Sequence, residues 1–545
     1  MKKDRILVAG AIAIIGVTGT IALQANDDES EAQQFRFQPN SLVLSRSVYV
    51  GDADTVTPGQ TLPPGCVAKT VTLPLLAGGT TTVKVKCATA IDNGEYPNLQ
   101  DDHNVFNNDG PDGSFGVTSP IFLDNIDKQG KLIGTLPVPT GQLVTSFSSK
   151  SELAVNLSSD GKSITFVGYH GGPGFLTAPK QLDVSNSNTP GVVDPTNPVV
   201  SNYYRAVAEV DANGQIVLTY GNAYSGNNGR AAIKAGPYYY LSGNDNNGGL
   251  STSQLTGTQV GVNLITSTGS ELLIPQQTPP TPPDINMIGD FEVTQVGYAK
   301  ADKPGKDNNF RGLTVFNSTL YVTKGSGGNG INTVYQVGNA GTLPTPTDVK
   351  NAPITILPGF PTTLANGAAQ DGTTGHPVMF PFGIWFANAN TLYVCDEGDG
   401  GLVAPRIING QINVADDSEL ATAGLQKWSL VNGTWQLLYI LQDGLEIGVP
   451  YRVADYPAAL NPATGGCRNL TGRANGDGTV DLFAVTSTIS ANVDQGADPN
   501  KLVAVKDLLD ATSLPAGGRG LTHFTTLRTA QAGEVLRGIS FAPGQ

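Results

Sequence analysis

Charged residues are scarce in this chain, and basic residues are scarcer than acidic ones. Asp, Glu, Lys and Arg make up only 14% of the 545 residues, whereas about a quarter is usual. The 32 Lys and Arg are outnumbered by 46 Asp and Glu, which leaves a net charge of −14. Because binding to phosphates needs a basic patch, and no basic run offsets the acidic balance, we expect no nucleic-acid partner.

Histidine is also rare, with four residues in the whole chain. No pair of them has metal-ligand spacing, and the sequence contains neither a phosphate-loop motif nor a Gly-x-Ser-x-Gly nucleophile elbow. His376 precedes an apolar run that begins at Phe382, and we predict it as the candidate general base. His170 is a second candidate. The alternative for both is an ordinary loop histidine.

Cysteine occurs four times, and no Cys-x-x-Cys pair suggests a zinc or redox site. Cys66 and Cys87 flank two short β-type runs around Gly78-Gly79, a pattern that predicts a hairpin closed by a disulfide. For Cys395 and Cys467 the sequence leaves two alternatives open, a second bridge or two buried thiols.

Long apolar runs are absent after the N-terminus. Lys2, Lys3 and Arg5 precede an apolar stretch over residues 6–23, which predicts a secretory signal peptide over 1–25 and an exported protein, periplasmic or extracellular. The alternative is an uncleaved anchor, because the stretch approaches membrane-spanning length. We expect contact with a membrane only through this segment.

Turn-forming residues, in contrast, are abundant. The chain has 67 Gly and 36 Pro, and 39% of its residues are hydrophobic. This composition predicts many tight turns, few long helices and a large core, and therefore an all-β fold.

An internal repeat defines the architecture. Its form is an apolar strand, a Gly or Asn turn and a second apolar strand, and further strand pairs lie between the copies. Two inner strands followed by two outer strands make one four-stranded blade of a β-propeller. The copies begin at residues 151, 230, 311, 382, 469 and 537.

The last copy contains only a first strand, and the N-terminal region has apolar strands that lack an inner partner. We therefore predict that residues 26–545 form one propeller, closed by pairing of the N- and C-terminal strands. The count is most simply six blades, with seven as the alternative if residues 257–296 contain another. Residues 52–118 and the Pro-rich connector 275–285 are predicted insertions.

The repeat places Arg230, Arg311 and Arg537 at equivalent positions, each opening an inner strand. Inner strands line the central channel of a propeller, so these side chains are predicted to converge at one mouth and bind an anionic ligand. The alternative is that each arginine holds nearby loop carbonyls or an acidic side chain.

Acidic loops suggest calcium as a cofactor. Asp396 and Asp399 follow an inner strand, and we predict them as ligands, because Ca²⁺ takes six to eight oxygens from such loops. The loops at Asn244–Asn247 and Asn475–Asp481 offer further oxygens. For Asn475–Asp481 the favoured interpretation is a hairpin turn.

The run from Asn309 to Gly338, Asp124 and the ending Arg537-Gly-Ile-Ser-Phe-Ala-Pro resemble a family of exported bacterial propellers over residues 115–545. More distantly, the pattern of Arg-Gly-apolar followed by Leu-Tyr-Val is similar to NHL-repeat and gluconolactonase-like propellers. Those include calcium-dependent lactone hydrolases and non-enzymatic binding modules. The resemblance implies the fold and no defined activity, and no gluconolactonase metal site matches residue by residue.

Two functions are compatible with these features. The first is a binding or structural module for an extracellular ligand or macromolecular partner. The alternative is a hydrolase or lyase acting on an anionic small molecule, lactone or polysaccharide at the central channel, with His376 as base and calcium assistance. Because propellers host both classes, the fold alone does not decide between them.

Overall fold

The structure is a computed structural model that places most of the chain after residue 34. The described residues are 35–50, 60–62, 65–75, 78–85, 87–89, 91–97, 104–107, 117–147, 149, 152–170, 187–190, 203–244, 261–266, 285–289, 291–302, 307–325, 329–365, 379–398, 406–408, 411–413, 422–456, 461–489, 496, 498–516 and 520–544. The predicted signal peptide, much of the 52–118 insertion and residues 275–284 of the connector lie outside them.

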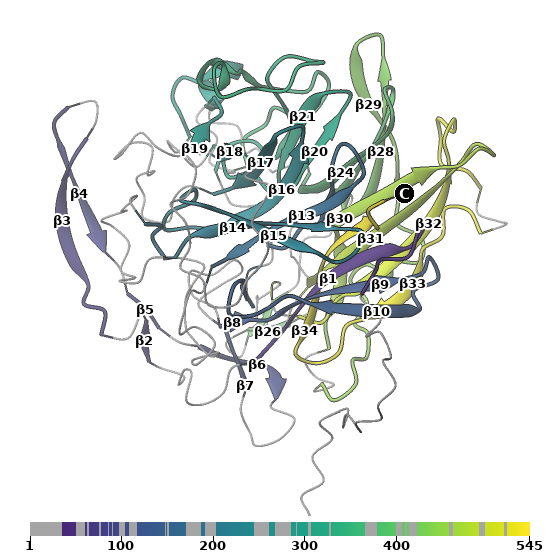
Figure 1. The fold of residues 1–545 in the computed structure, drawn as a ribbon, viewed down its shortest axis with the longest axis horizontal. Helices are drawn as coiled ribbons and strands as arrows, with labels where there is room; N and C mark the ends of the chain where they lie inside the picture. Colours follow the sequence, from purple (N-terminus) through teal and green to yellow (C-terminus); the bar gives the residue numbers. More distant parts are fainter. Residues whose placement is uncertain are drawn as a thin grey trace, which may run out of the picture. The chain divides into compact units, whose positions relative to one another are not determined.

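The fold is a β-propeller of six four-stranded blades, as the repeat predicts (Figure 1). Helix is sparse in the described residues: the 3₁₀ turns η2 (Val293–Val296) and η3 (Val349–Asn351), and the single 3₁₀ residue Thr422. The alternative of seven blades is wrong. Residues 257–296 contain β18 (Val262–Thr266) and β19 (Ile285–Met287), which are the outer strands of the second blade.

We number the blades by the order of their innermost strands. Blade 1 contains β12 (Asn156–Leu157), β13 (Ser163–Tyr169), β14 (Arg205–Asp211) and β15 (Ile216–Gly221). Blade 2 contains β16 (Gly229–Ala235), β17 (Tyr238–Gly243), β18 and β19. Blade 3 contains β20 (Leu313–Phe316), β21 (Thr319–Lys324), β22 (Thr333–Val337) and β23 (Ile354–Ile356).

The remaining blades follow the same antiparallel order. Blade 4 contains β24 (Pro381–Asn388), β25 (Thr391–Asp396), β28 (Gly424–Val431) and β29 (Thr434–Leu441). Blade 5 contains β30 (Ala463–Ala474), β31 (Thr479–Ile489), β32 (Lys501–Leu508) and β33 (Thr525–Thr529). Blade 6 contains β34 (Glu534–Phe541), β1 (Leu42–Val48), β9 (Ile121–Ile126) and β10 (Leu132–Pro137).

Blade 6 closes the ring with both ends of the chain, which confirms the predicted closure. Its innermost strand β34 pairs antiparallel with β1, with Leu42 opposite Phe541 and Val48 opposite Glu534. The core of this blade joins Leu44 from β1 to Ile539 from β34, both fully buried or nearly so. Strands from the two ends of the chain therefore share one sheet. Because β1 and β34 pair with each other, neither strand leaves an open edge on that side.

The six first strands pack backbone against backbone. A β-carbon added to Gly312 would lie 2.1 Å from the carbonyl oxygen of Phe382, and one added to Gly538 would lie 2.5 Å from the carbonyl oxygen of Leu153. Between blades 1 and 2, Ala154 and Ala231 form a parallel bridge. A small residue is thus required at these contacts because no side chain fits there, whereas blade 5 has Asn469 at the equivalent position, whose side chain donates to the carbonyl oxygen of Arg537 in blade 6.

Polar clusters and one disulfide join neighbouring blades farther from the axis. Between blades 4 and 5, the buried Lys427 Nζ lies 3.3 Å from Asp507 Oδ2, and Asp507 also accepts hydrogen bonds from the hydroxyls of Tyr393 and Tyr439. Between blades 1 and 2, Lys234 and Tyr239 both donate to Glu209. Between blades 5 and 6, Arg528 pairs with Asp124.

Two disulfides are present. Cys66–Cys87 closes the hairpin of β3 (Lys69–Pro74) and β4 (Thr80–Val85), as predicted. Cys395–Cys467 resolves the open alternative in favour of a bridge, and it joins β25 of blade 4 to β30 of blade 5. The remaining described short strands form four pairs: β2 (Thr61–Leu62) with β5 (Ala88–Thr89), β6 (Ile91–Pro97) with β7 (Asn104–Asn107), β8 (Thr118–Ser119) with β11 (Thr145–Ser146), and β26 (Arg406–Ile408) with β27 (Gln411–Asn413).

The two faces of the propeller differ in their connections. First strands begin, and second strands end, at one face, which we call the insertion face. Most of the long connections leave the sheets there: 49–120, 170–204, 244–261, 288–312, 357–380, 397–423 and 442–462. At the opposite turn face most connections are tight, such as 236–237, 317–318, 389–390 and 432–433.

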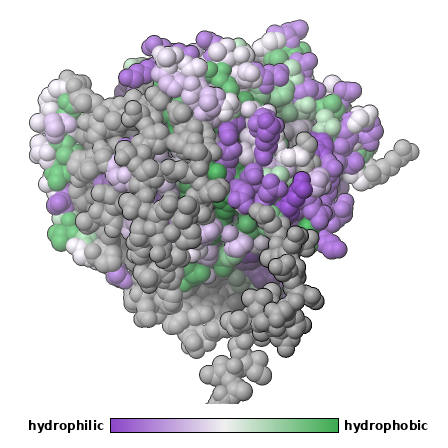
Figure 2. All heavy atoms as spheres, viewed as in Figure 1, coloured by the Kyte–Doolittle hydropathy of each residue, from purple (hydrophilic) through white to green (hydrophobic). Residues whose placement is uncertain are grey.

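Figure 2 shows hydrophilic residues over much of the described surface in this view, with hydrophobic residues in small, separate patches. No helix among the described residues is long and apolar enough to cross a membrane.

The close contact of first strands predicts an asymmetric effect of two glycine substitutions. Gly312→Ala forces a methyl group against the Phe382 carbonyl, and we expect a loss of about 1–3 kcal/mol in the free energy of unfolding, measured by denaturant titration. Gly476→Ala, in a turn with no atom within 4 Å of the added carbon, serves as the control and should leave stability nearly unchanged. Equal effects would contradict the packing constraint.

Candidate functional site

The predicted arginines are at most 3% exposed. Arg230 lies at the beginning of β16 and Arg311 lies two residues before β20, but Arg537 lies in the middle of β34 and does not open it as predicted. Arg230 Nη1 donates to the carbonyl oxygen of Phe310 at 2.9 Å and to the side chain of Asn309. These acceptors belong to the segment that leads into the first strand of blade 3. Arg230 therefore links blade 2 to the next blade around the ring.

Arg537 makes the same kind of link from blade 6 to blade 1. Its two terminal nitrogens donate to the carbonyl oxygens of Phe147 and Ser149, and Nε donates to Ser47 Oγ at 3.2 Å. Arg311 is held through its backbone, because its N–H donates to the Thr323 carbonyl and its own carbonyl accepts from Ser242. For Arg230 and Arg537 this geometry corresponds to the structural alternative, and an anion site remains a prediction.

A fourth arginine completes this set, and the sequence analysis missed it. Arg468 lies in β30 of blade 5, one residue before the position at which that repeat copy was begun. Its Nε lies 3.1 Å from Glu397 Oε2, and both side chains are nearly inaccessible, 4% and 2% exposed. Glu397 follows β25 of blade 4, so this buried ion pair and the adjacent Cys395–Cys467 disulfide hold the same blade interface.

Two more buried charged residues were also missed, one before the first strand of blade 1 and one at the end of the second strand of blade 3. Glu152 is buried and accepts hydrogen bonds from Thr145 Oγ1 at 2.7 Å, from Ser146 N and from the Tyr169 hydroxyl. Burial raises its pKa, and the Arg537 charge acts in the opposite direction. Lys324 ends β21, and burial followed by the charge of Arg311 lowers its pKa to about 7.

The predicted general base, His376, lies outside the described residues. His170 follows β13 and is 3% exposed. Its Nδ1 lies 2.9 Å from the carbonyl oxygen of Gln142, and its ring contacts Tyr220 edge-on at 4.6 Å. Burial lowers the pKa of His170, which favours a neutral imidazole that donates this bond. This environment is that of a buried structural histidine.

The predicted calcium ligands are only partly described. Asp396 is fully buried, and its carboxylate accepts hydrogen bonds from the backbone N–H groups of Phe380 and Gly398 and from Gln426. Asp399 lies outside the described residues. Within the described ranges, no group of three or more His, Cys, Asp or Glu side chains is arranged to hold a metal ion. Calcium therefore stays a prediction.

The Asn475–Asp481 segment adopts the turn that the sequence favoured. Asp477 Oδ1 accepts hydrogen bonds from the backbone N–H and the hydroxyl of Thr479, which closes the tight connection between β30 and β31. Asn244 follows β17, and residues 245–247 lie outside the described part of the chain.

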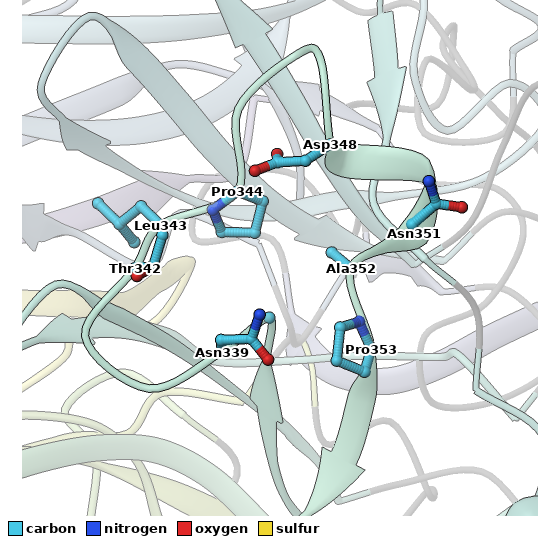
Figure 3. A pocket seen from close by; sticks show the side chains of 9 residues that line it. Asn339, Thr342, Leu343, Pro344, Asp348, Asn351, Ala352 and Pro353 are labelled. Carbon is cyan, nitrogen blue, oxygen red and sulfur yellow. The ribbon is translucent and has the colours of Figure 1, made fainter.

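A pocket of about 220 Å³ lies in the β22–β23 connection of blade 3, at the turn face. Figure 3 shows Asp348 on one side of it and Asn339 and Pro353 on the opposite side. Asp348 accepts hydrogen bonds from the backbone and hydroxyl of Thr345, which stabilise the turn. Its lining also includes Thr342, Leu343, Asn351 and Ala352, and it shares no residue with the charged positions described above.

Comparisons with known proteins do not identify a family. No sequence model of a known protein family and no curated protein matches the chain. Among solved structures, a mutant apocarotenoid oxygenase of Synechocystis is similar, with 9% sequence identity and a TM-score of 0.22 over 88% of this chain and 66% of that chain. A chimera of that oxygenase gives the same values. The chain thus spans just under two thirds of these proteins, and so weak a likeness carries no inference about function.

The arginine contacts generate a stability prediction. Arg537→Ala should lower the free energy of unfolding by about 2–4 kcal/mol, because carbonyl groups left buried without a donor cost about 1–3 kcal/mol each. Arg473→Ala removes a hydrogen bond to Asn40 in an exposed setting and a contact with the Phe541 ring, but it leaves no buried carbonyl without its donor, so it should cost only about 1 kcal/mol. If Arg537→Ala were as mild as this control, the interblade role would be wrong.

Asp396 generates a prediction about pH. Burial raises its pKa from 3.8 to about 7. Between pH 4 and 7 the native state therefore retains a proton that the unfolded chain has released. The contribution of Asp396 to the free energy of unfolding is fully present below pH 4 and is lost as the pH rises through 7. In thermal unfolding, the melting temperature of Asp396→Asn should rise relative to that of the wild type between pH 4 and 7. Above pH 7 the difference should become constant.

The control for this series is Asp477→Asn, because the pKa of the exposed Asp477 is lowered by its bonds to Thr479. Its contribution to stability is lost only as the pH falls below the ordinary aspartate range. The melting-temperature difference for this variant should stay constant between pH 5 and 8. A constant difference for Asp396→Asn over pH 4–7 would contradict the titration assigned to Asp396.

Proposed function

We propose that the protein is an exported binding or structural propeller that holds an extracellular ligand or macromolecular partner at its insertion face. One observation carries this proposal. Most of the long connections leave the blades at that face, whereas the turn face consists mainly of tight turns. Recognition residues in proteins lie disproportionately on loops that a rigid scaffold positions.

The use made of the charged residues supports binding over catalysis. Arg230 and Arg537 are buried and donate to backbone carbonyls of the next blade, and Arg468 is paired with Glu397. A catalytic anion clamp would instead keep its donors directed at a substrate. The alternative of a hydrolase or lyase gains no support from these contacts.

The disulfides support an oxidising compartment. Cys66–Cys87 and Cys395–Cys467 account for all four cysteines. Stable disulfides are typical of proteins outside the cytoplasm. Together with the predicted signal peptide they favour export, and calcium and an anionic ligand remain candidates for the binding assay.

The two faces offer a matched pair of exposed aliphatic residues for the test. Val449, in the 442–462 connection at the insertion face, is 52% exposed, and Leu514, in the 509–524 connection at the turn face, is 53% exposed. Replacing either residue with aspartate changes the surface alone. Any difference between the variants in binding therefore reports the face that is used.

The experiment screens the mature protein against polysaccharides, sugar acids, lactones and phosphates, with calcium and with a chelator. We expect binding of at least one compound to raise the melting temperature without turnover. Val449→Asp should weaken that binding about tenfold, which corresponds to about 1.4 kcal/mol, and Leu514→Asp should leave it unchanged. Turnover of a compound, or loss of binding only in Leu514→Asp, would contradict the proposal.

A further inference from the structure

Lys324 and Asn332 form an unusual buried pair at the insertion face of blade 3. Lys324 ends β21 and is 1% exposed, and Asn332, which precedes β22, is 3% exposed. Lys324 Nζ donates to Asn332 Oδ1 at 3.1 Å. A lysine ammonium rarely occupies such a site, because burial of a charge is costly unless the charge is well compensated.

A buried carboxyl group lies beside the pair. Asp307 is fully buried, and its Oδ2 accepts a hydrogen bond from Val293 N. A β-carbon added to Gly330 would lie 3.3 Å from Asp307 Oδ1 and 3.2 Å from Lys324 Cε. Gly330 therefore marks the point at which the two side chains approach each other, and its missing side chain leaves the space between them.

Apolar side chains pack beside this triad. Ile331 precedes Asn332 and Tyr335 follows it by three residues, and both belong, with Phe291 and Phe310, to the core cluster under blade 3. Burial lowers the pKa of Lys324 to about 7, the nearby charges of Arg311 and Arg230 act in the same direction, and Asp307 and Asp302 oppose them. A large fraction of the amine is therefore neutral at neutral pH, and a neutral desolvated lysine is a nucleophile.

We propose that Lys324 and Asn332 are joined by an intramolecular isopeptide bond, with Asp307 as the general acid and base. The amine nitrogen attacks Cγ of Asn332, a bond forms between Nζ and Cγ, and the bond between Cγ and Nδ2 breaks. A proton passes from Nζ through the Asp307 carboxyl group to the departing nitrogen, which leaves as ammonia. The step exchanges one amide for another and needs no oxidant or cofactor.

The bond would close the chain between residues 324 and 332 covalently. Like a disulfide, it restricts the unfolded chain, but reductants do not break it. The buried pair of Lys427 and Asp507 provides an internal comparison, because condensation there would release water rather than ammonia. Mass therefore distinguishes the two sites.

The test is mass spectrometry of the purified protein after reduction and alkylation. An unmodified chain gives separate tryptic peptides on either side of Lys324, whereas acylation of Nζ prevents cleavage there. We expect a single peptide over residues 312–350, lighter by one ammonia, without backbone fragments between Lys324 and Asn332. Recovery of the two separate, unmodified peptides as the main products would overturn the proposal.

Variants separate this bond from other losses of ammonia. Asn329-Gly330 is a succinimide-forming dipeptide, so Asn329→Gln is expected to retain both the mass loss and the resistance to trypsin. Lys324→Met and Asn332→Ala should abolish the mass loss. Asp307→Asn removes the acid at nearly constant volume and should reduce the cross-linked fraction at least tenfold, with circular dichroism confirming the fold.

The matched control is Asp302→Asn, because Asp302 also lies near Lys324 and accepts a hydrogen bond from Gly330 N at 2.8 Å. This variant should cross-link as the wild type does. A mass loss that disappears in Asn329→Gln, or that Asp307→Asn leaves unchanged while the chain is folded, would overturn the assignment of these residues.

Discussion

Most neighbouring first strands approach each other too closely to leave space for a side chain between them, and the rest of the propeller depends on this contact. Gly312, Gly383 and Gly538 each approach the backbone of the next blade so closely that a β-carbon would overlap it. The second, third and fourth strands then splay outward, where Tyr, Trp and Leu side chains fill the widening wedges between sheets. In the sequence, this close contact appears as the glycine of the Arg-Gly and Phe-Gly pairs in the repeat.

The same contact explains where the few basic residues go. Packing at the axis interrupts regular pairing at the start of each first strand, and backbone carbonyls there need donors. Arg230 and Arg537 supply several donors from one side chain and reach across to the next blade. In a chain with so few charges, placing buried arginines at these positions indicates that they serve the joints between blades.

The sequence was sufficient for the features that are local or periodic. Strand pairs, the Cys66–Cys87 hairpin and the closure of the ring followed from alternation, turn residues and an incomplete last copy of the repeat. It was insufficient where partners are remote, since Arg537 bonds to a carbonyl 388 residues away and Cys395 pairs with a cysteine of another blade. Lys324 could have been found from the sequence, because the repeat aligns it with Asp396. The two residues carry opposite charges, so a comparison based on shared residue types does not single out this position. His376 and Asp399 lie outside the described residues, and their roles stay predictions.

Closure by β34 has a consequence for the order in which the protein is made. The innermost strand of blade 6 follows every other blade strand in the chain, and its partner β1 precedes them. A nascent chain can form blades 1 to 5 while it is synthesised, but blade 6 stays open until β34 has been made. Closure of the ring therefore has to wait for the last of its strands, however early the other blades form. A chain truncated before Glu534 would present the open edge of β1 to other molecules.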